Sequence, residues 1–328
     1  VGGTITVNPR TGNQRPRLVR LTDKESLINS LGFPNKGLDQ VEKDLRSTVN
    51  IRGSRPLILS ISGTSVTDML ICHRRLEPLA NAIEINISSP NTAGLRTFHD
   101  PSNLGHLLAI LSEKRVKPLM VKLPPYPSVE KSAQVETADK ILNLIRVCLR
   151  EGVEAVTAAN SRPVNEPKLA VGSGGLSGKL VFDAMIRMVS DIKGEVADNM
   201  SINACGGIFT ANDAWLALQA GATTVQLYTG MLYQGPGIAK DINLERLSSI
   251  FVHAQCSSMS GPRPWLGLVR IARIPNRGFR QRLARPGLRR VRESGTDTLR
   301  ELSRRIQGPA PPDAPTRGGR LCVRPRGR

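Results

Sequence analysis

The chain has 328 residues, of which 39% are hydrophobic and 22% charged, and its formal net charge is +19. These values exclude a wholly disordered chain and provide for one large domain or two ordinary ones. No stretch approaches the roughly 18 consecutive apolar residues of a membrane-spanning helix, and no signal sequence opens the chain. The five cysteines form no CxxC pair, which argues against a zinc site or a disulfide framework and favours a reducing compartment.

Short β-rich runs alternate with amphipathic helical segments over residues 1–256. Apolar residues three and four apart predict helices over 133–149 and 179–193, and Thr210 with Asp213 predicts the start of another. Seven runs carry few charges and are predicted as parallel strands buried on both faces: Gly3–Thr6, Leu57–Ser62, Ile83–Ser88, Leu119–Leu123, Ala155–Ala159, Ile202–Cys205 and Thr224–Tyr228. The predicted fold class is therefore α/β, an eight-stranded βα (TIM) barrel that lacks its first strand in this chain.

A doubly wound open sheet is the structural alternative. Such a sheet normally carries a glycine-rich turn after its first strand, whereas Gly2 and Gly3 come at the start of the first strand here. The connection 7–56 is unusually long, and its Pro9 and Gly12 predict a small hairpin or lid on the barrel rim rather than a plain helix.

Polar residues stand where two of these strands end, which is where a βα barrel carries its reactive groups. The run from Asn86 to Asn91 contains two asparagines and two serines around Pro90, although an ordinary Asn/Ser/Pro turn is the alternative. Lys122 lies in an otherwise apolar strand, where burial requires an anionic partner unless the side chain reaches the surface. These residues predict a site for an anionic cofactor or substrate.

Glycine-containing loops are predicted near three later strands. Gly174–Gly178 is expected as a loop opening the helix at 179, Gly206 and Gly207 follow the strand 202–205, and Thr229-Gly230 follows the last strand. Glycine lets backbone N–H groups approach an anion, and the last βα loops of barrels usually bind phosphate. The four histidines fall away from the strand ends, so no metal site or catalytic triad is predicted.

The last 72 residues differ in composition from the rest. Residues 257–328 contain 18 arginines, no lysine, four acidic residues, nine prolines and nine glycines, which predicts a basic, disordered low-complexity tail. One interpretation is an unselected tail, such as a frame-shifted one, because nucleic-acid tails usually mix lysine with arginine. The other is an arm that binds nucleic acid, with Trp265 and Phe279 available to stack on bases.

Four motifs taken together resemble dihydroorotate dehydrogenases, most closely the serine-type, quinone-linked class. They are Asn86–Arg96, Gly174–Gly178, Cys205–Gly207 and Val225–Thr229, and the resemblance runs from residue 1 to about 251. It implies an FMN-binding βα barrel that oxidises dihydroorotate to orotate in de novo pyrimidine (UMP) biosynthesis and passes the electrons to quinone. It also implies association with the membrane on its cytoplasmic side.

The resemblance implies roles for individual residues. Ser89 matches the catalytic base that removes the C5 proton while a hydride passes from C6 to the flavin. The matching substrate-binding residues are Asn29, Asn86, Asn91, Asn160 and Ser161. The matching cofactor-binding residues are Thr4, Asn86, Lys122, Ser177, Gly178, Gly206, Gly207, Tyr228 and Thr229. Lys122 would stabilise negative charge near the flavin N1 edge.

The sequence also departs from this family. A first strand with a second flavin-side lysine, and a membrane-docking extension, would precede Val1, so a truncated barrel is expected, cytoplasmic and soluble if that extension is absent. The segment Lys122–Tyr126 is closer to the soluble, cysteine-base class. Two alternatives stay open: a related flavin enzyme of pyrimidines with another electron acceptor, and an inactive fragment that binds FMN weakly and whose tail binds nucleic acid.

Overall fold

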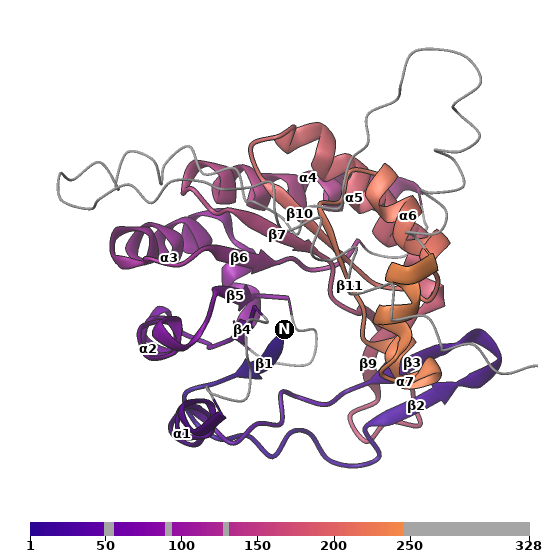
Figure 1. Cartoon of the computed structure of the whole chain (residues 1–328), viewed down its shortest axis with the longest axis horizontal. Helices are drawn as coiled ribbons and strands as arrows, with labels where there is room; N and C mark the ends of the chain where they lie inside the picture. The colour runs from indigo at the N-terminus through magenta and orange to yellow at the C-terminus, as the bar shows by residue number, and fades with distance from the viewer. Residues whose placement is uncertain (49–55, 89–93, 127–130, 246–328) are drawn as a thin grey trace, which may run out of the picture. The chain divides into compact units, whose positions relative to one another are not determined.

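Seven parallel strands form one curled sheet at the centre of the described structure (Figure 1). This computed structural model describes residues 1–48, 56–88, 94–126 and 131–245. The strands are, in their order across the sheet, β1 (Gly2–Ile5), β4 (Ile58–Ile61), β5 (Ala82–Asn86), β6 (Leu119–Lys122), β7 (Ala155–Ala158), β10 (Ser201–Cys205) and β11 (Thr224–Gln226). All seven predicted strands are confirmed, each with its ends within two residues of those expected.

Taken in chain order, the seven strands of this sheet each lie beside the one before, and every neighbouring pair is parallel. A doubly wound sheet reverses its strand order at a switch point, so the sequential order excludes that alternative. Within the described residues β1 and β11 stand at the two ends of the order and are not paired with each other. The sheet is thus a TIM-barrel-like arrangement with seven strands, as predicted.

Helices alternate with the strands. They are α1 (Leu38–Thr48), α2 (Val66–Leu76), α3 (Pro101–Lys114), α4 (Lys131–Arg150), α5 (Phe182–Val196), α6 (Ala211–Gln219) and α7 (Thr229–Gln234), with short 3-10 turns η1 (Thr22–Lys24), η2 (Glu77–Leu79), η3 (Leu95–His99) and η4 (Lys179–Val181). The predicted helices over 133–149 and 179–193 correspond to α4 and to η4 with α5. Thr210 begins α6 through a reciprocal capping box, in which its hydroxyl accepts from the Asp213 N–H at 3.1 Å. No helix of the described residues is long and apolar enough to cross a bilayer.

A second, antiparallel sheet has the order β2 (Leu18–Leu21), β3 (Ser26–Asn29), β9 (Ser173–Gly178), β8 (Arg162–Asn165). The β2–β3 pair confirms the hairpin predicted in the long connection, but the same connection also contains helix α1, which the prediction missed. The segment Gly174–Gly178, expected as a loop, is strand β9. Its glycines permit this pairing, because a Cβ at Gly174 would lie 2.7 Å from the Asn29 carbonyl oxygen.

Apolar side chains from the central sheet and its helices form one continuous core. Ile83 and Ile85 of β5 are fully buried in it together with Leu104 of α3 and Val189 of α5. A smaller cluster around Ile28 lies under the antiparallel sheet. This packing fixes the strands rigidly, so that the residues at their carboxyl ends have defined positions. Ser89, Asn91, the domain boundary at 256 and the tail 257–328 lie outside the described residues and stay predictions.

Candidate active site

Asn86 is the centre of a polar network that joins the ends of β1, β4 and β5. The side chain is only 5% exposed. Its Nδ2 donates to Oγ1 of Thr4 at 3.1 Å, and Thr4 Oγ1 lies 3.3 Å from Oγ of Ser60. Its Oδ1 accepts from the backbone N–H of Ser88 at 3.1 Å and from the Ser88 hydroxyl at 2.8 Å. The contacts fix the amide and also the backbone that leads into the motif containing Ser89.

Lys122 lies next to this network, because it pairs in register with Asn86. Its Nζ donates to Sγ of Cys205 on β10 at 3.9 Å. Burial, the largest single influence, lowers the pKa of Lys122, but the Cys205 sulfur and the Glu84 side chain together raise it above its usual value. A raised pKa favours the ammonium form. Since a thiol is a weak acceptor, this ammonium suits a further anionic partner.

Ser177 and Thr229 come together from β9 and α7. The Thr229 hydroxyl donates to Oγ of Ser177 at 3.0 Å, and Thr229 is 7% exposed. Tyr233 on the same helix donates to the carbonyl oxygen of Ser26 on β3 at 3.0 Å, which holds α7 against the antiparallel sheet. Tyr228 directly before the helix is 62% exposed, so a buried ligand would meet its backbone rather than its ring.

The glycine pair after β10 has a conformational reason of its own. Gly206 and Gly207 have φ angles of 139° and 74°, in the region that favours glycine. A Cβ at Gly207 would lie 2.6 Å from Cβ of Phe182, at the start of α5. Gly178 likewise has a φ of 97° and pairs in register with Ser26. The backbone path and the close packing of neighbouring residues thus account for these glycines.

Asn29, Asn160 and Ser161 follow other strand ends. Asn29 Nδ2 donates to the carbonyl oxygen of Gly175 at 3.3 Å. The Asn160 backbone N–H donates to the Leu123 carbonyl oxygen at 3.2 Å, and its Oδ1 accepts from the Ser161 N–H at 2.8 Å. Asn160 and Cys205 also line one cavity of about 20 Å³, which connects this strand end to the thiol beside Lys122.

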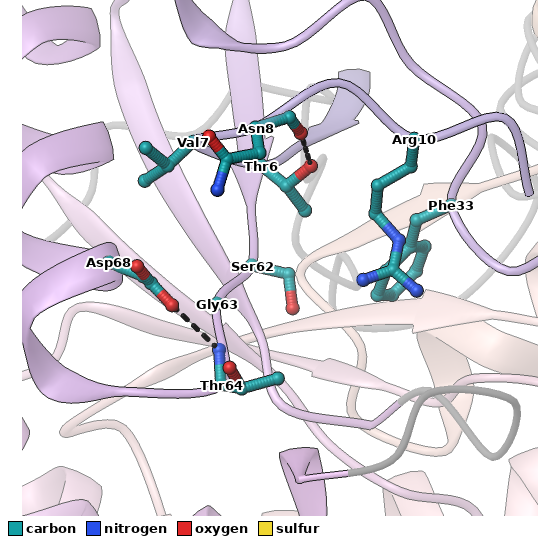
Figure 2. A pocket seen from close by; sticks show the side chains of 9 residues that line it. All are labelled: Thr6, Val7, Asn8, Arg10, Phe33, Ser62, Gly63, Thr64 and Asp68. Atoms are coloured by element: carbon teal, nitrogen blue, oxygen red, sulfur yellow. Dashed lines mark hydrogen bonds between the residues drawn. The ribbon is translucent and has the colours of Figure 1, made fainter.

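A larger cavity of about 120 Å³ opens beyond the ends of β1 and β4 (Figure 2). Its lining contains none of the predicted site residues and consists of Thr6, Val7, Asn8, Arg10, Phe33, Ser62, Gly63, Thr64 and Asp68. The sequence held a signal for part of it, because Thr6 and Ser62 follow Thr4 and Ser60 by two positions, the period at which strand residues share a face. Arg10 and Phe33 carry no such signal, since they come from the long connection.

The described groups form three separate pairs of hydroxyl, amide and ammonium side chains on the central sheet, on β9 and on α7. Thr4 meets Asn86, Lys122 meets Cys205, and Ser177 meets Thr229. Amides and hydroxyls can hydrogen-bond both donor and acceptor edges of a planar heterocycle, and the ammonium can stabilise developing negative charge. The site is therefore suited to a polar ring system that gains negative charge during reaction.

Comparisons with known proteins identify relatives of this chain. A model of the family described as dihydroorotate dehydrogenase matches residues 1–250. A dihydroorotate dehydrogenase (quinone) of Burkholderia cenocepacia (strain HI2424) is 37% identical over 255 residues, covering 73% of this chain and 72% of the relative. The enzyme of the same description from Burkholderia pseudomallei (strain 668) is 36% identical over 250 residues, with the same coverage.

Solved structures give the same result. The crystal structure of the Eimeria tenella dihydroorotate dehydrogenase (DHODH) in complex with ferulenol has a TM-score of 0.65 and 27% identity, covering 77% of this chain and 75% of that one. The ligand-free form of the Eimeria tenella protein also has a TM-score of 0.65, at 29% identity and 77% coverage of both chains. This chain belongs to the dihydroorotate dehydrogenase family.

Proposed function

We propose that this chain oxidises dihydroorotate to orotate in pyrimidine biosynthesis, with FMN as cofactor and quinone as electron acceptor. Membership of the family supports the reaction, and the description of the Burkholderia relatives supports the acceptor. Because quinones dissolve in lipid, the enzyme would reduce quinone at the membrane surface on the cytoplasmic side. The observation that carries the proposal is the hydrogen bond between Asn86 on β5 and Thr4 on β1, with Lys122 in register with Asn86 on the neighbouring strand β6.

The residues at these strand ends fit a flavin. The Thr4 hydroxyl and the Asn86 amide supply hydrogen-bonding groups for the polar edge of a flavin ring, and Lys122 supplies a positive charge where a reduced flavin becomes negative. A bound FMN would supply the acceptor for the hydride from C6 of the substrate. We assign the phosphate end to Ser177 and Thr229 and to the backbone of Gly178, Gly206, Gly207 and Tyr228.

We assign the proton at C5 of the substrate to Ser89. A serine hydroxyl is a weak base, so exclusion of water and a hydrogen-bonded relay must assist it. Asn86 contributes to the position of the base, because it accepts hydrogen bonds from both the N–H and the hydroxyl of Ser88 and so orients the residue directly before Ser89. The remaining substrate contacts are assigned to Asn29, Asn91, Asn160 and Ser161.

The test uses the full chain, its FMN content and its dihydroorotate-dependent reduction of quinone. Ser89→Ala is expected to retain FMN but to slow flavin reduction by dihydroorotate at least about 100-fold, because the proton acceptor is lost. Lys122→Met is expected to weaken FMN binding about tenfold or more, because a charged hydrogen-bond donor is lost. The matched controls are Ser102→Ala and Lys114→Met on α3, which should change neither property.

Two outcomes would contradict parts of this proposal. Oxidation of dihydroorotate with fumarate or a nicotinamide cofactor, but not with quinone, would show that the acceptor is wrong and would favour the related flavin enzyme. Failure of the folded wild-type chain to bind FMN at all would favour the inactive fragment.

A further inference from the structure

A row of polar side chains crosses the inner face of the central sheet below the strand ends. Successive strand residues point to opposite faces, and Ile83 and Ile85 lie in the core with the helices, so Glu84 and Asn86 face inward. Barrel interiors are mostly filled by large aliphatic side chains. Here the inward positions of four strands instead hold Glu84, Thr157, Asn203, Thr224 and Gln226.

Hydrogen bonds connect the row across β11, β10, β7 and β5. Thr224 Oγ1 donates to Asn203 Oδ1 at 3.0 Å. Asn203 Nδ2 donates to Gln226 Oε1 at 2.9 Å and to Thr157 Oγ1 at 3.2 Å. Thr157 Oγ1 donates to Glu84 Oε2 at 2.7 Å. Because a hydroxyl has one proton and Asn203 occupies an acceptor position of Thr157, that proton is directed to Glu84, whose oxygen accepts as a carboxylate does.

The row places this carboxylate beside Lys122. Glu84 is 1% exposed and belongs to β5, whereas its partner Thr157 belongs to β7, so the Glu84 side chain crosses the inner face of β6. Lys122 projects from that face, and it pairs in register with Thr157. Neighbouring strands lie about 4.8 Å apart, so the carboxylate lies close enough for its charge to act on Lys122, whose Nζ donates its hydrogen bond to Cys205.

Burial of either charge alone would be costly. An isolated buried ammonium gives up its proton readily and an isolated buried carboxylate takes one up, whereas opposite charges that lie close together stabilise each other. Two titratable groups face Lys122 within the described residues, Cys205 from β10 and Glu84 from β5.

We propose that Glu84 is a positioning residue, whose carboxylate is fixed by the Thr157–Asn203–Gln226 row and holds Lys122 charged and directed toward the strand ends. The effect of Glu84 on FMN binding rests on the proposed function, because it requires a flavin at those strand ends. The effect of Glu84 on the charge of Lys122 does not require a flavin. The two parts can therefore be tested separately.

The first test measures the ionisation of Lys122 in the full chain without cofactor. Lysine labelled with ¹³C at Cε is titrated by NMR, and the Lys122 signal is the one missing from Lys122→Arg. Glu84→Gln keeps the size of the side chain and an acceptor for the Thr157 hydroxyl but removes the charge. We expect it to raise the acid dissociation constant of Lys122 about tenfold or more.

Glu77→Gln is the matched control. Glu77 is also a buried glutamate, 8% exposed, and it lies just before β5 in the chain. Its carboxylate, however, accepts from the backbone N–H groups of Val116 and Lys117 at 2.7 and 2.8 Å. Its substitution should lower stability and leave the Lys122 titration unchanged. Thr157→Val, which removes the hydroxyl that donates to Glu84, should shift the Lys122 titration in the same direction as Glu84→Gln but by less. This variant replaces Glu84→Gln in the test if Glu84→Gln does not fold.

The second test measures FMN affinity against pH by quenching of flavin fluorescence. Glu84→Gln should move the alkaline loss of FMN binding to lower pH, whereas Glu77→Gln should not. An unchanged Lys122 titration in both Glu84→Gln and Thr157→Val would overturn the proposal, even in a chain that oxidises dihydroorotate. A shifted titration in a chain that binds no FMN would support the pairing and contradict the proposed function.

Discussion

Three cysteines of the described residues differ in what surrounds the sulfur atom. Cys72 and Cys148 are buried, and burial raises the pKa of each thiol to about 12. Cys205 is partly exposed and lies beside Lys122 at the strand ends. Since the thiolate is the reactive form, the first two should be inert in the folded chain.

We therefore expect iodoacetamide at pH 8 to label Cys205 well before Cys72 and Cys148, and added FMN to slow that labelling. Mass spectrometry of proteolytic peptides measures each site separately, including Cys256 and Cys322. Cys205→Ser is the control for the assignment. Labelling of Cys72 at the rate of Cys205 in the folded chain would show that the burial described here is wrong.

A buried histidine makes stability depend on pH. His73 on α2 is 6% exposed, and its Nε2 lies 3.8 Å from Oε1 of Glu77. Burial lowers the pKa of His73 more than the Glu77 carboxylate raises it, and Arg115 lowers it further. The unfolded chain therefore binds the proton more readily, so stability is lost as the pH falls below about 6.5, the usual pKa of histidine.

The expected result is a Tm that decreases between pH 7.5 and pH 5.5, with part of the decrease absent in His73→Gln. Differential scanning fluorimetry across this range measures it. His106→Gln changes an exposed histidine on α3 and should keep the full decrease. Parallel curves for the wild type and His73→Gln would contradict this expectation.

At the scale of elements, the strands of the central sheet could be predicted and β9 could not. The central strands are short runs with few charges and with apolar residues on the face that packs against the helices, and such runs are visible in one sequence. Gly174–Gly178 has almost no side chains, so its strand conformation comes from pairing with β3 and β8 rather than from local preference. Helix α1 was missed because proline and glycine dominate the start of its connection.

The same difference explains how much of the site could be predicted. The motifs indicated Thr4, Asn86, Lys122, Ser177 and Thr229, whose roles stay predictions; in the structure the first four lie on strands and Thr229 begins α7. The Glu84 row was not foreseen, because a hydrogen bond from β7 to β5 depends on the curvature of the sheet, which no local pattern encodes. Pocket residues such as Arg10 were missed for a related reason, since a long connection brings them to the ends of β1 and β4.

Close pairing of β3 with β9 gives a prediction at this scale. Gly174→Ala should destabilise the chain by about 1–3 kcal/mol, because the new Cβ would press on the Asn29 carbonyl oxygen. Gly194→Ala on α5 is the control, since a Cβ there meets no atom within 4 Å and alanine favours a helix by about 0.5–1 kcal/mol. Urea unfolding followed by circular dichroism measures both. Equal effects of the two substitutions would contradict the proximity of the strands.

At the scale of the whole molecule, charge and proposed chemistry belong to different parts of the chain. Residues 257–328 carry a formal charge of +14, and the other 256 residues carry +5. Every described residue that we assign to FMN or substrate lies before residue 230. The domain 1–256 is therefore proposed to act without the tail.

Deletion of 257–328 should leave FMN content and quinone reduction unchanged. It should also reduce the salt dependence of RNA binding, because each lost phosphate contact lowers the slope of log K against log salt by about 0.7–0.9. Flavin titration and binding assays at several salt concentrations measure the two effects. Loss of FMN on deletion would show that the tail contributes to the folded domain.

The order of the strands has a consequence for biosynthesis on the ribosome. In the central sheet, each strand after β1 pairs with a strand that has already been synthesised. Asn29 of β3 instead pairs with Gly175 of β9, which is synthesised 146 residues later. At about 5–20 residues per second that delay lasts roughly 7–30 s. An isolated two-stranded hairpin is only marginally stable in water, so during this interval the nascent β2–β3 pair is the segment most in need of a chaperone.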